Sequence, residues 1–312
     1  MKFIKDMKPG DRLADIYFCK YKAAATTKNG KPYENVTLQD RTGTADAKIW
    51  EPNGQGIDEF EAMDYVDIFG EVTSFNGALQ VNIKRVRRCR EAEVDAALYM
   101  PVSARNREEM VGELETLIGS IGEPHLKALL EAFFLRDLSF REAFCKSSAA
   151  KTVHHAFIGG LLEHTLSVAQ LCDFISGRYA ALDRDLLVTA AILHDIGKVR
   201  ELSAFPANDY TDEGQFMGHI VMGSEMISER IRTLEESFPA ELELKLKHCI
   251  LAHHGELEYG SPKKPALIEA MALNHADDLD AKLETFSELL AASGESGWLG
   301  FNRLLETNIY KA

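Results

Sequence analysis

The sequence predicts two domains, a small all-β barrel followed by a larger all-α domain. Its 312 residues exceed the usual size of a single domain. Residues 1–90 combine apolar-polar alternation with Asn-Gly turns, which indicate strands and hairpins. From about residue 106 the apolar residues recur at helical spacing. We therefore expect a barrel over 1–90, a connection over 91–105 that contains Pro101, and a helical domain over 106–312.

Five strand-like runs follow one another in the first domain. They cover 13–25, 33–39, 44–50, 65–75 and 78–88. Asn-Gly at 29–30 and again at 76–77 joins the first pair and the last pair, and this dipeptide is a strong hairpin signal. The segment GIDEFEAM at 56–63 is expected to form one short helix between the third and fourth strands. Five strands with a helix at that place is the order of an OB-fold, a barrel that binds oligonucleotides or oligosaccharides.

Aromatic and basic side chains of this barrel are candidates for binding a single strand of nucleic acid. Base stacking needs an aromatic face beside a basic groove. Any one aromatic could instead fill the barrel core, which is the commoner use of such a residue. The basic run from Lys84 to Arg88 is open between a phosphate contact and a charged edge that discourages aggregation. The candidate substrate-binding residues are Lys28, Lys31, Tyr33, Trp50 and Phe75, with Tyr17 and Tyr21 as further aromatics.

The distribution of charge places a polyanion on the first domain. The net charge is −14, yet residues 1–90 hold 15 Lys and Arg against 13 Asp and Glu, and the rest hold 20 against 36. The near-neutral barrel is thus the expected contact for nucleic acid. No apolar run is long enough to span a membrane, and the charged start MKFIKDMKPGDR does not resemble a signal peptide. We expect a cytoplasmic protein whose five scattered cysteines are reduced and buried.

A series of helices is expected after residue 106. Gly197 and Gly255 are expected to end two of them, and Pro265 to open the long last one. Helical length and spacing cover 107–121, 124–135, 139–145, 156–178, 183–196, 219–234, 241–253 and 265–293.

Histidine and aspartate residues lie on or at the ends of these helices. Neutral imidazoles and carboxylates are the ligands that divalent and transition metals take from proteins. One histidine near a helix end is usually structural, but a set of this size favours a metal centre in a helical core. An Asp beside a His can bridge two ions, while periodicity alone does not choose among Asp277, Asp278 and Asp280. The candidates are His164 in GGLLEHT, His194 and Asp195 in LHDIGK, His219 in MGHIV, His253 and His254 in LAHHG, and Asp277 in HADDLDAK.

These motifs, in this order, resemble the HD superfamily of metal-dependent phosphohydrolases. The stretches HHAFIGGLLEHTLSVA, AAILHDIGKVREL, GHIVMGSEMI, LAHHGELEYGSPKKP and LNHADDLDAKLE are more closely similar to YhaM-type 3′→5′ exoribonucleases, which join an N-terminal OB-fold to an HD domain. The resemblance implies a first metal held by His164, His194, Asp195 and Asp277. It implies that Asp195 also bridges to a second metal held by His219 and His253, with His254 as a further ligand or a phosphate contact.

The same resemblance implies the activity and the cofactor. It implies hydrolysis of single-stranded RNA, with DNA left open, to nucleoside 5′-monophosphates by water activated between two metals. Asp195 and Lys198 would be catalytic, although Lys198 could instead be a lysine interacting with a helix dipole. His154 and His155 would lie on the substrate side. Imidazole and carboxylate ligands suit two divalent ions, Mn²⁺ foremost, with Mg²⁺, Fe²⁺ or Co²⁺ as other options.

Three other functions stay open. One keeps HD chemistry but acts on a small nucleotide or cyclic dinucleotide, although no segment resembles the GYP motif of cyclic-di-GMP hydrolases. A second is an oxygen-activating di-iron protein. A third is a non-catalytic nucleic-acid-binding protein, against which the retained ligand set argues. The expected partners are single-stranded RNA or DNA and no membrane, and a homo-oligomer is left open.

Overall fold

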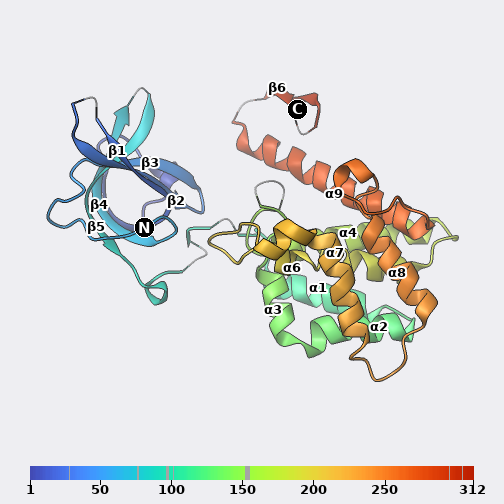
Figure 1. The fold of residues 1–312 in the computed structure, drawn as a ribbon. Coiled ribbons are helices and arrows are strands. Elements are labelled where there is room, and N and C mark those ends of the chain that lie inside the picture. The colour runs from blue at the N-terminus through green and yellow to red at the C-terminus, as the bar shows by residue number, and fades with distance from the viewer. Residues whose placement is uncertain are drawn as a thin grey trace. The chain divides into compact units, whose positions relative to one another are not determined.

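A computed structural model describes residues 1–27, 29–75, 77–95, 98–100, 102–151, 155–294, 296–303 and 305–312. They form two compact units, both visible in Figure 1. One unit comprises Met1–Val102 with Phe205–Ala207, and the other Ser103–Ala204 with Asn208–Ala312. The first is a β barrel and the second is helical, which confirms the predicted fold class.

The first unit is a closed five-stranded barrel. Its strands are β1 (Arg12–Thr26), β2 (Pro32–Asp40), β3 (Gly43–Ile49), β4 (Tyr65–Phe75) and β5 (Ala78–Arg88). The order is β1-β2-β3-β5-β4, with β4 returning to β1, and only β3 and β5 pair in parallel among these strands. Alternate side chains such as Leu38, Val72 and Val81 fill the interior, as the period of two predicts. A 3-10 turn at Ile4–Asp6 adds Ile4 to this core.

The connection between β3 and β4 differs from the prediction. Residues 56–63 contain no helix; Ile57 forms an isolated parallel bridge with Val86, and the Phe60 side chain is buried in the barrel core. The three-residue spacing of Ile57 and Phe60 fits one face of a helix, but an extended chain buries the same two side chains against the barrel. The predicted helix was therefore wrong.

The helical unit follows the predicted series closely. Its helices are α1 (Arg107–Gly119), α2 (Pro124–Glu131), α3 (Leu138–Lys146), α4 (Gly160–Arg178), α5 (Arg184–Leu193), α6 (Lys198–Glu201), α7 (Asp212–Ile231), α8 (Ala240–Ala252) and α9 (Ile268–Ala292). A π-helical turn over Ala132–Arg136 follows α2, and 3-10 turns cover Glu91–Glu93 in the first unit and Leu257–Tyr259 in the second. Side-chain oxygens accept from backbone N–H groups in the first turns of several helices, which satisfies groups that the helix leaves unpaired. These N-caps include Asn106, Asp137, Asp183 and Thr211.

Helix α5 lies at the centre of this unit. Every residue from Leu186 to Leu193 is buried, and the helix packs against α4, α8 and α9. A helix that is apolar on all sides is one that other helices surround. The chain leaves α5 at Leu193 while still in the interior, so the His-Asp pair that follows is buried as well. The core of the unit thus sets the position of the candidate site.

A β-hairpin at the C-terminus was not predicted. Strands β6 (Gly297–Asn302) and β7 (Thr307–Lys311) form a two-stranded sheet after α9. The Lys311 ammonium donates to the carbonyls of Leu290 and Ser293, which ties the hairpin to the end of α9. Aromatic residues favour strands, and Trp298 and Tyr310 pair their rings across this sheet.

Two further expectations can be compared with the structure. All five cysteines are free and buried, as predicted for reduced thiols. Among the described residues, no helix combines the length and the apolar character that crossing a bilayer requires.

Candidate metal centre

The predicted ligands come together from five helices of the second unit. His164 lies in the second turn of α4, His194 caps the end of α5, and Asp195 follows it. His219 lies in α7, His253 caps the end of α8 with His254 next to it, and Asp277 lies in α9. Residues separated by up to 113 positions along the chain thereby face one interior point.

One group of donor atoms comprises His164, His194, Asp195 and Asp277. The His164 Nε2 atom lies 3.1 Å from Asp277 Oδ1 and 3.2 Å from His194 Nε2. Asp195 Oδ2 lies 3.3 Å from His194 Nε2 and 3.5 Å from His164 Nε2. The two histidines and Asp195 are buried, and Asp277 is largely so. Two imidazoles and two carboxylates therefore converge within one ligand shell.

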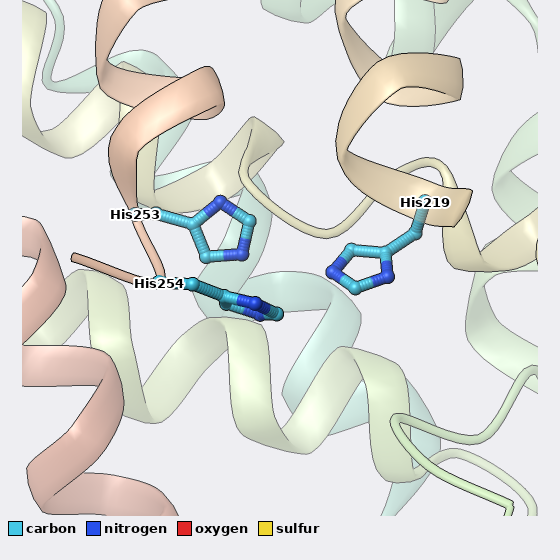
Figure 2. Close-up of side chains that lie close together, drawn as sticks. All are labelled: His219, His253 and His254. Atoms are coloured by element: carbon cyan, nitrogen blue, oxygen red, sulfur yellow. The ribbon is translucent and has the colours of Figure 1, made fainter. Parts of the chain in front are cut away.

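A second group of donor atoms lies on the other side of Asp195. Asp195 Oδ1 is 3.4 Å from His219 Nε2 and 3.8 Å from His253 Nε2. Figure 2 shows the His219 ring facing the rings of His253 and His254, and the centroids of the rings of His219 and His254 are 5.2 Å apart. Asp195 presents one oxygen to each group, as a bridging carboxylate does.

Each of these histidines has its Nδ1 atom engaged, which turns its Nε2 atom toward the centre. An imidazole whose Nδ1 donates to an oxygen keeps Nε2 free as a metal ligand. The sequence builds two of these contacts locally, because the accepting carbonyl lies three residues earlier in the same helix. The Nδ1 partners are Asp280 for His164 (2.7 Å), the Ala191 carbonyl for His194 (2.7 Å), Glu201 for His219 (3.0 Å), the Ile250 carbonyl for His253 (2.7 Å) and the Tyr259 carbonyl for His254 (2.9 Å).

Three of the inward atoms make no hydrogen bond. Asp195 Oδ1, His219 Nε2 and His253 Nε2 are buried without a partner among the described residues. A buried polar atom without a partner costs free energy, and proteins rarely keep three of them together unless a ligand satisfies them. Imidazole nitrogens with carboxylate oxygens form a donor set for a divalent cation. The residues present therefore fit the two-metal arrangement.

The carboxylates of the centre are held in their charged form. Burial by itself would raise the pKa of Asp195, but the charges of Lys198 and His194 outweigh it and lower that pKa well below its usual range. Burial likewise opposes protonation of His164, yet hydrogen bonds with Asp277 and Asp280 raise its pKa to about 9, so a metal bound at its Nε2 atom would displace a proton. The carboxylates carry negative charge at neutral pH, which favours a cation between them.

Lys198 reaches into the same centre. It is the first residue of α6, and its ammonium lies 2.6 Å from Asp195 Oδ2. Burial would lower its pKa, but the charge of Asp195 outweighs this and raises it. Lys198 is therefore a charged group beside Asp195, and it contacts a carboxylate rather than the carbonyl end of a helix.

Close backbone packing brings Lys198 and His219 to the same place. A side chain at Gly197 would put its Cβ atom 2.0 Å from the His219 carbonyl oxygen. Glycine at this position lets α7 approach the turn after Asp195. This contact is the structural reason for the glycine in the HDIGK motif.

Geometry separates the three aspartates that periodicity left open. Asp277 faces the centre, Asp278 is exposed and pairs with Lys282 at 2.7 Å, and Asp280 lies behind His164. Asp280 also accepts a hydrogen bond from Ser167 and lies 3.2 Å from His155 Nε2. Asp277 and Asp280 are three residues apart and so share a helix face.

Other predicted contact residues lie in diverse surroundings. His154 and Lys28 lie outside the described residues. His155 is buried and contacts Asp280 instead of lining an exposed surface. Sequence reasoning missed Glu201 as a partner of His219; its signal was an acidic residue three positions after Lys198 in the same short helix.

The barrel residues divide between surface and core. Tyr33 and Trp50 stack with ring centroids 5.1 Å apart, and Phe75 is exposed. Tyr17 is buried and donates to the Lys2 carbonyl, so it belongs to the core. Lys31, like Tyr21, is exposed.

The basic run at the end of β5 is engaged within the barrel. Lys84 and Arg87 contact the acidic residues Glu71 and Asp67 on the neighbouring strand β4. Arg85 covers the Phe69 ring. These contacts favour the charged strand edge over a phosphate site.

Comparison with known proteins finds a family match and a similar solved structure. The HD domain family matches residues 161–282, a segment that holds every candidate ligand from His164 to Asp277. HD domains bind divalent metals, and this match indicates a metal-dependent phosphohydrolase. A solved structure that is similar to the chain is the second OB-fold domain of replication protein A from Methanococcus maripaludis. The match has 17% sequence identity and a TM-score of 0.22, and it covers 29% of this chain and 95% of the replication protein A domain.

Proposed function

We propose that the protein is a metal-dependent 3′→5′ exonuclease that hydrolyses single-stranded RNA to nucleoside 5′-monophosphates, with DNA left open as a second substrate. Its cofactor is proposed to be two divalent ions, Mn²⁺ foremost. The first would be held by His164, His194, Asp195 and Asp277. The second would be held by Asp195, His219 and His253, with His254 beside them.

The observation that carries this proposal is the two-sided environment of Asp195. One of its oxygens adjoins His164 and His194, and the other faces His219 and His253, whose Nε2 atoms make no hydrogen bond with any residue that the structure describes. A one-metal centre would need only the first group. The second group of buried, unsatisfied donors therefore supports a pair of ions.

The chemistry suits a phosphodiester. Two cations held by these residues would supply an activated water and would neutralise negative charge that develops on phosphate oxygens. The Lys198 ammonium, at 2.6 Å from Asp195 Oδ2, adds a fixed positive charge beside this carboxylate. His254 keeps its Nε2 atom free because Nδ1 bonds the Tyr259 carbonyl, so it can contact a phosphate or a metal.

The barrel is proposed to hold the strand. The stacked pair of Tyr33 and Trp50 offers an aromatic surface, and Phe75 offers another at the end of β4. Aromatic side chains bind successive bases of a single strand without sequence preference. Cleavage from the 3′ end and RNA as a substrate are supported by the similarity of the sequence motifs to YhaM-type enzymes.

The test is cleavage of a 5′-labelled single-stranded RNA with Mn²⁺, with and without a chelator. We expect labelled products that shorten step by step in the presence of Mn²⁺ only. Asp195→Ala should abolish them, because it removes a ligand of both metals. Asp278→Ala is the matched control, since this exposed aspartate lies one residue from Asp277 and faces away from the centre.

Each component of the proposal has its own contradicting result. Full activity of Asp195→Ala would refute the metal mechanism. Immediate release of a labelled mononucleotide would refute the polarity alone. Cleavage of small cyclic dinucleotides with no cleavage of RNA or DNA strands would replace the nuclease by a small-nucleotide phosphodiesterase.

A further inference from the structure

Helix α7 is interrupted immediately before His219. Gly218 has φ 72° and ψ 155°, a backbone conformation that is far from helical and that favours glycine. The break leaves the backbone N–H of His219 without the carbonyl that a continuous helix would supply. His219 therefore presents two free donors at this point, its backbone N–H and its ring Nδ1–H.

One carboxylate oxygen satisfies both donors. Glu201 Oε1 lies 2.9 Å from the His219 backbone nitrogen and 3.0 Å from its Nδ1 atom. A single oxygen thus fixes the backbone and the ring of the same residue. With Nδ1 held as donor, Nε2 is the free nitrogen, and it faces Asp195 Oδ1 at 3.4 Å. Figure 2 shows the ring directed toward His253 and His254.

Glu201 is itself held firmly. Its backbone carbonyl accepts from the Thr211 N–H at 2.9 Å, and a Cβ atom at Gly214 would lie only 2.3 Å from that oxygen. The residue is buried, and a buried carboxylate is costly unless it is hydrogen-bonded. Its two hydrogen bonds with His219 satisfy this carboxylate and preorganise it toward one partner.

We propose that Glu201 is the positioning residue of the second metal, and that loss of its carboxylate converts a two-metal centre into a one-metal centre. This inference rests on the two-metal arrangement proposed above. The first metal does not depend on Glu201, because His164, His194 and Asp277 take their orientation from Asp280, from the Ala191 carbonyl and from α9. Mutation of a residue that hydrogen-bonds to a metal ligand commonly lowers the metal affinity by about 10- to 100-fold.

The test is the number of Mn²⁺ ions bound by the full-length protein, measured by equilibrium dialysis and elemental analysis without substrate. The variants are Glu201→Gln, which keeps an acceptor oxygen but removes the charge, and Glu201→Ala, which removes both. We expect wild type to bind two ions, Glu201→Gln to bind the second roughly 10-fold more weakly, and Glu201→Ala roughly 100-fold more weakly. Binding of the first ion should be unchanged in both variants.

Matched controls separate positioning from stability. Glu229→Gln removes a carboxylate that joins the same two helices, through Arg200 at 3.1 Å, without contacting His219. This variant should bind two ions like wild type. His219→Ala should reproduce the one-metal state of Glu201→Ala, because it removes the ligand that Glu201 orients.

Two results would overturn the inference. The first is Glu201→Gln and Glu201→Ala binding both ions with wild-type affinity, even if their melting temperatures fall, since that pattern belongs to a purely structural residue. The second is wild type binding a single ion, which leaves no second metal to position. A protein that binds two ions and loses one in Glu201→Ala, but cleaves no nucleic acid, would refute the proposed nuclease and leave this inference standing.

Discussion

At the scale of single residues, the orientation of each histidine in the centre depends on the hydrogen-bond partner of its Nδ1 atom. His194 and His253 use a carbonyl three residues earlier, a contact that the helix supplies by its own geometry. His164 and His219 have no such carbonyl partner and rely on Asp280 and Glu201. The sequence could predict the candidate ligands, since His and Asp motifs stand out. It could not predict their carboxylate partners, because a lone Glu or Asp in a helix is usually exposed to solvent.

A residue-scale prediction concerns Asp280. Asp280→Asn keeps the size of the side chain but removes the charge that helps to hold His164, so affinity for the first metal should fall by about 10- to 100-fold. A metal titration, detected by the melting temperature at each metal concentration, measures this affinity. Asp173→Asn is the control, because Asp173 also joins two helices, through Arg184 at 2.6 Å, away from the centre. Equal metal affinity in both variants would show that Asp280 is not needed for metal binding.

At the scale of elements, glycine sets the spacing of α6 and α7. Gly197→Ala would bring a Cβ atom to 2.0 Å from the His219 carbonyl oxygen, so the two helices must separate. We expect a loss of about 1–3 kcal/mol in the free energy of unfolding, the usual range for forced overpacking. Chemical denaturation provides the measurement. Gly112→Ala in α1 has open space around it and should instead stabilise the protein by up to about 1 kcal/mol.

A second element-scale prediction concerns the start of α3. Asp137 caps that helix, and its hydrogen bond with Arg230, joined by the backbone contact to Phe140, lowers its pKa to about 2. Because the folded pKa lies below the unfolded value, its contribution to stability is full above about pH 4 and is lost as the pH falls toward 2. Asn is as good an N-cap as Asp, so Asp137→Asn isolates the charge.

The measurement for Asp137 is urea unfolding of wild type and Asp137→Asn at pH 6 and at pH 3. The variant should be less stable than wild type at pH 6, and the difference should shrink at pH 3. A difference that is constant with pH would contradict the role of the charge. The Arg230 guanidinium, which also covers the Phe133 ring, keeps its packing in both proteins.

Element boundaries show where prediction from sequence stops. The strands and most of the helices lie close to their predicted ranges, because periodicity reports burial directly. Residues 56–63 and the C-terminal hairpin were not predicted, since short apolar spacings fit more than one backbone shape. The start of α7 at Asp212 was also missed: the predicted helix began at 219, where Gly218 breaks the helix internally.

At the scale of the whole molecule, the two units carry separate parts of the proposed activity. Trp50→Ala removes the larger and more exposed ring of the pair with Tyr33, and one base stack is worth about 1–3 kcal/mol. The KM for a 20-nucleotide strand should therefore rise roughly 5- to 150-fold, while kcat/KM for a dinucleotide stays the same. Phe174→Ala, a change of an exposed aromatic residue on α4, should alter neither value. Unchanged steady-state kinetics in Trp50→Ala would exclude the ring from strand binding.

The division into a barrel and a helical unit was predictable from composition and period, and the position of the centre was predictable in part. The His-Asp pair follows the most apolar helix, α5, which already indicates a buried site. What the sequence could not give is distance. The position of Asp195 between the two groups of donor atoms depends on how α7 and α8 pack around it, and this requires contacts between residues far apart in the chain.

The buried cysteines allow the local unfolding of each unit to be followed separately. Cys19 and Cys89 lie in the barrel unit, and Cys145, Cys172 and Cys249 lie in the helical unit. Burial raises the pKa of all five thiols, and an alkylating reagent reacts with the exposed thiolate. Pulsed alkylation, detected by mass spectrometry, would therefore time the local unfolding of the two units separately in one sample, without any mutation of the protein. The alkylation rates of the two groups of cysteines therefore compare how often each unit unfolds locally.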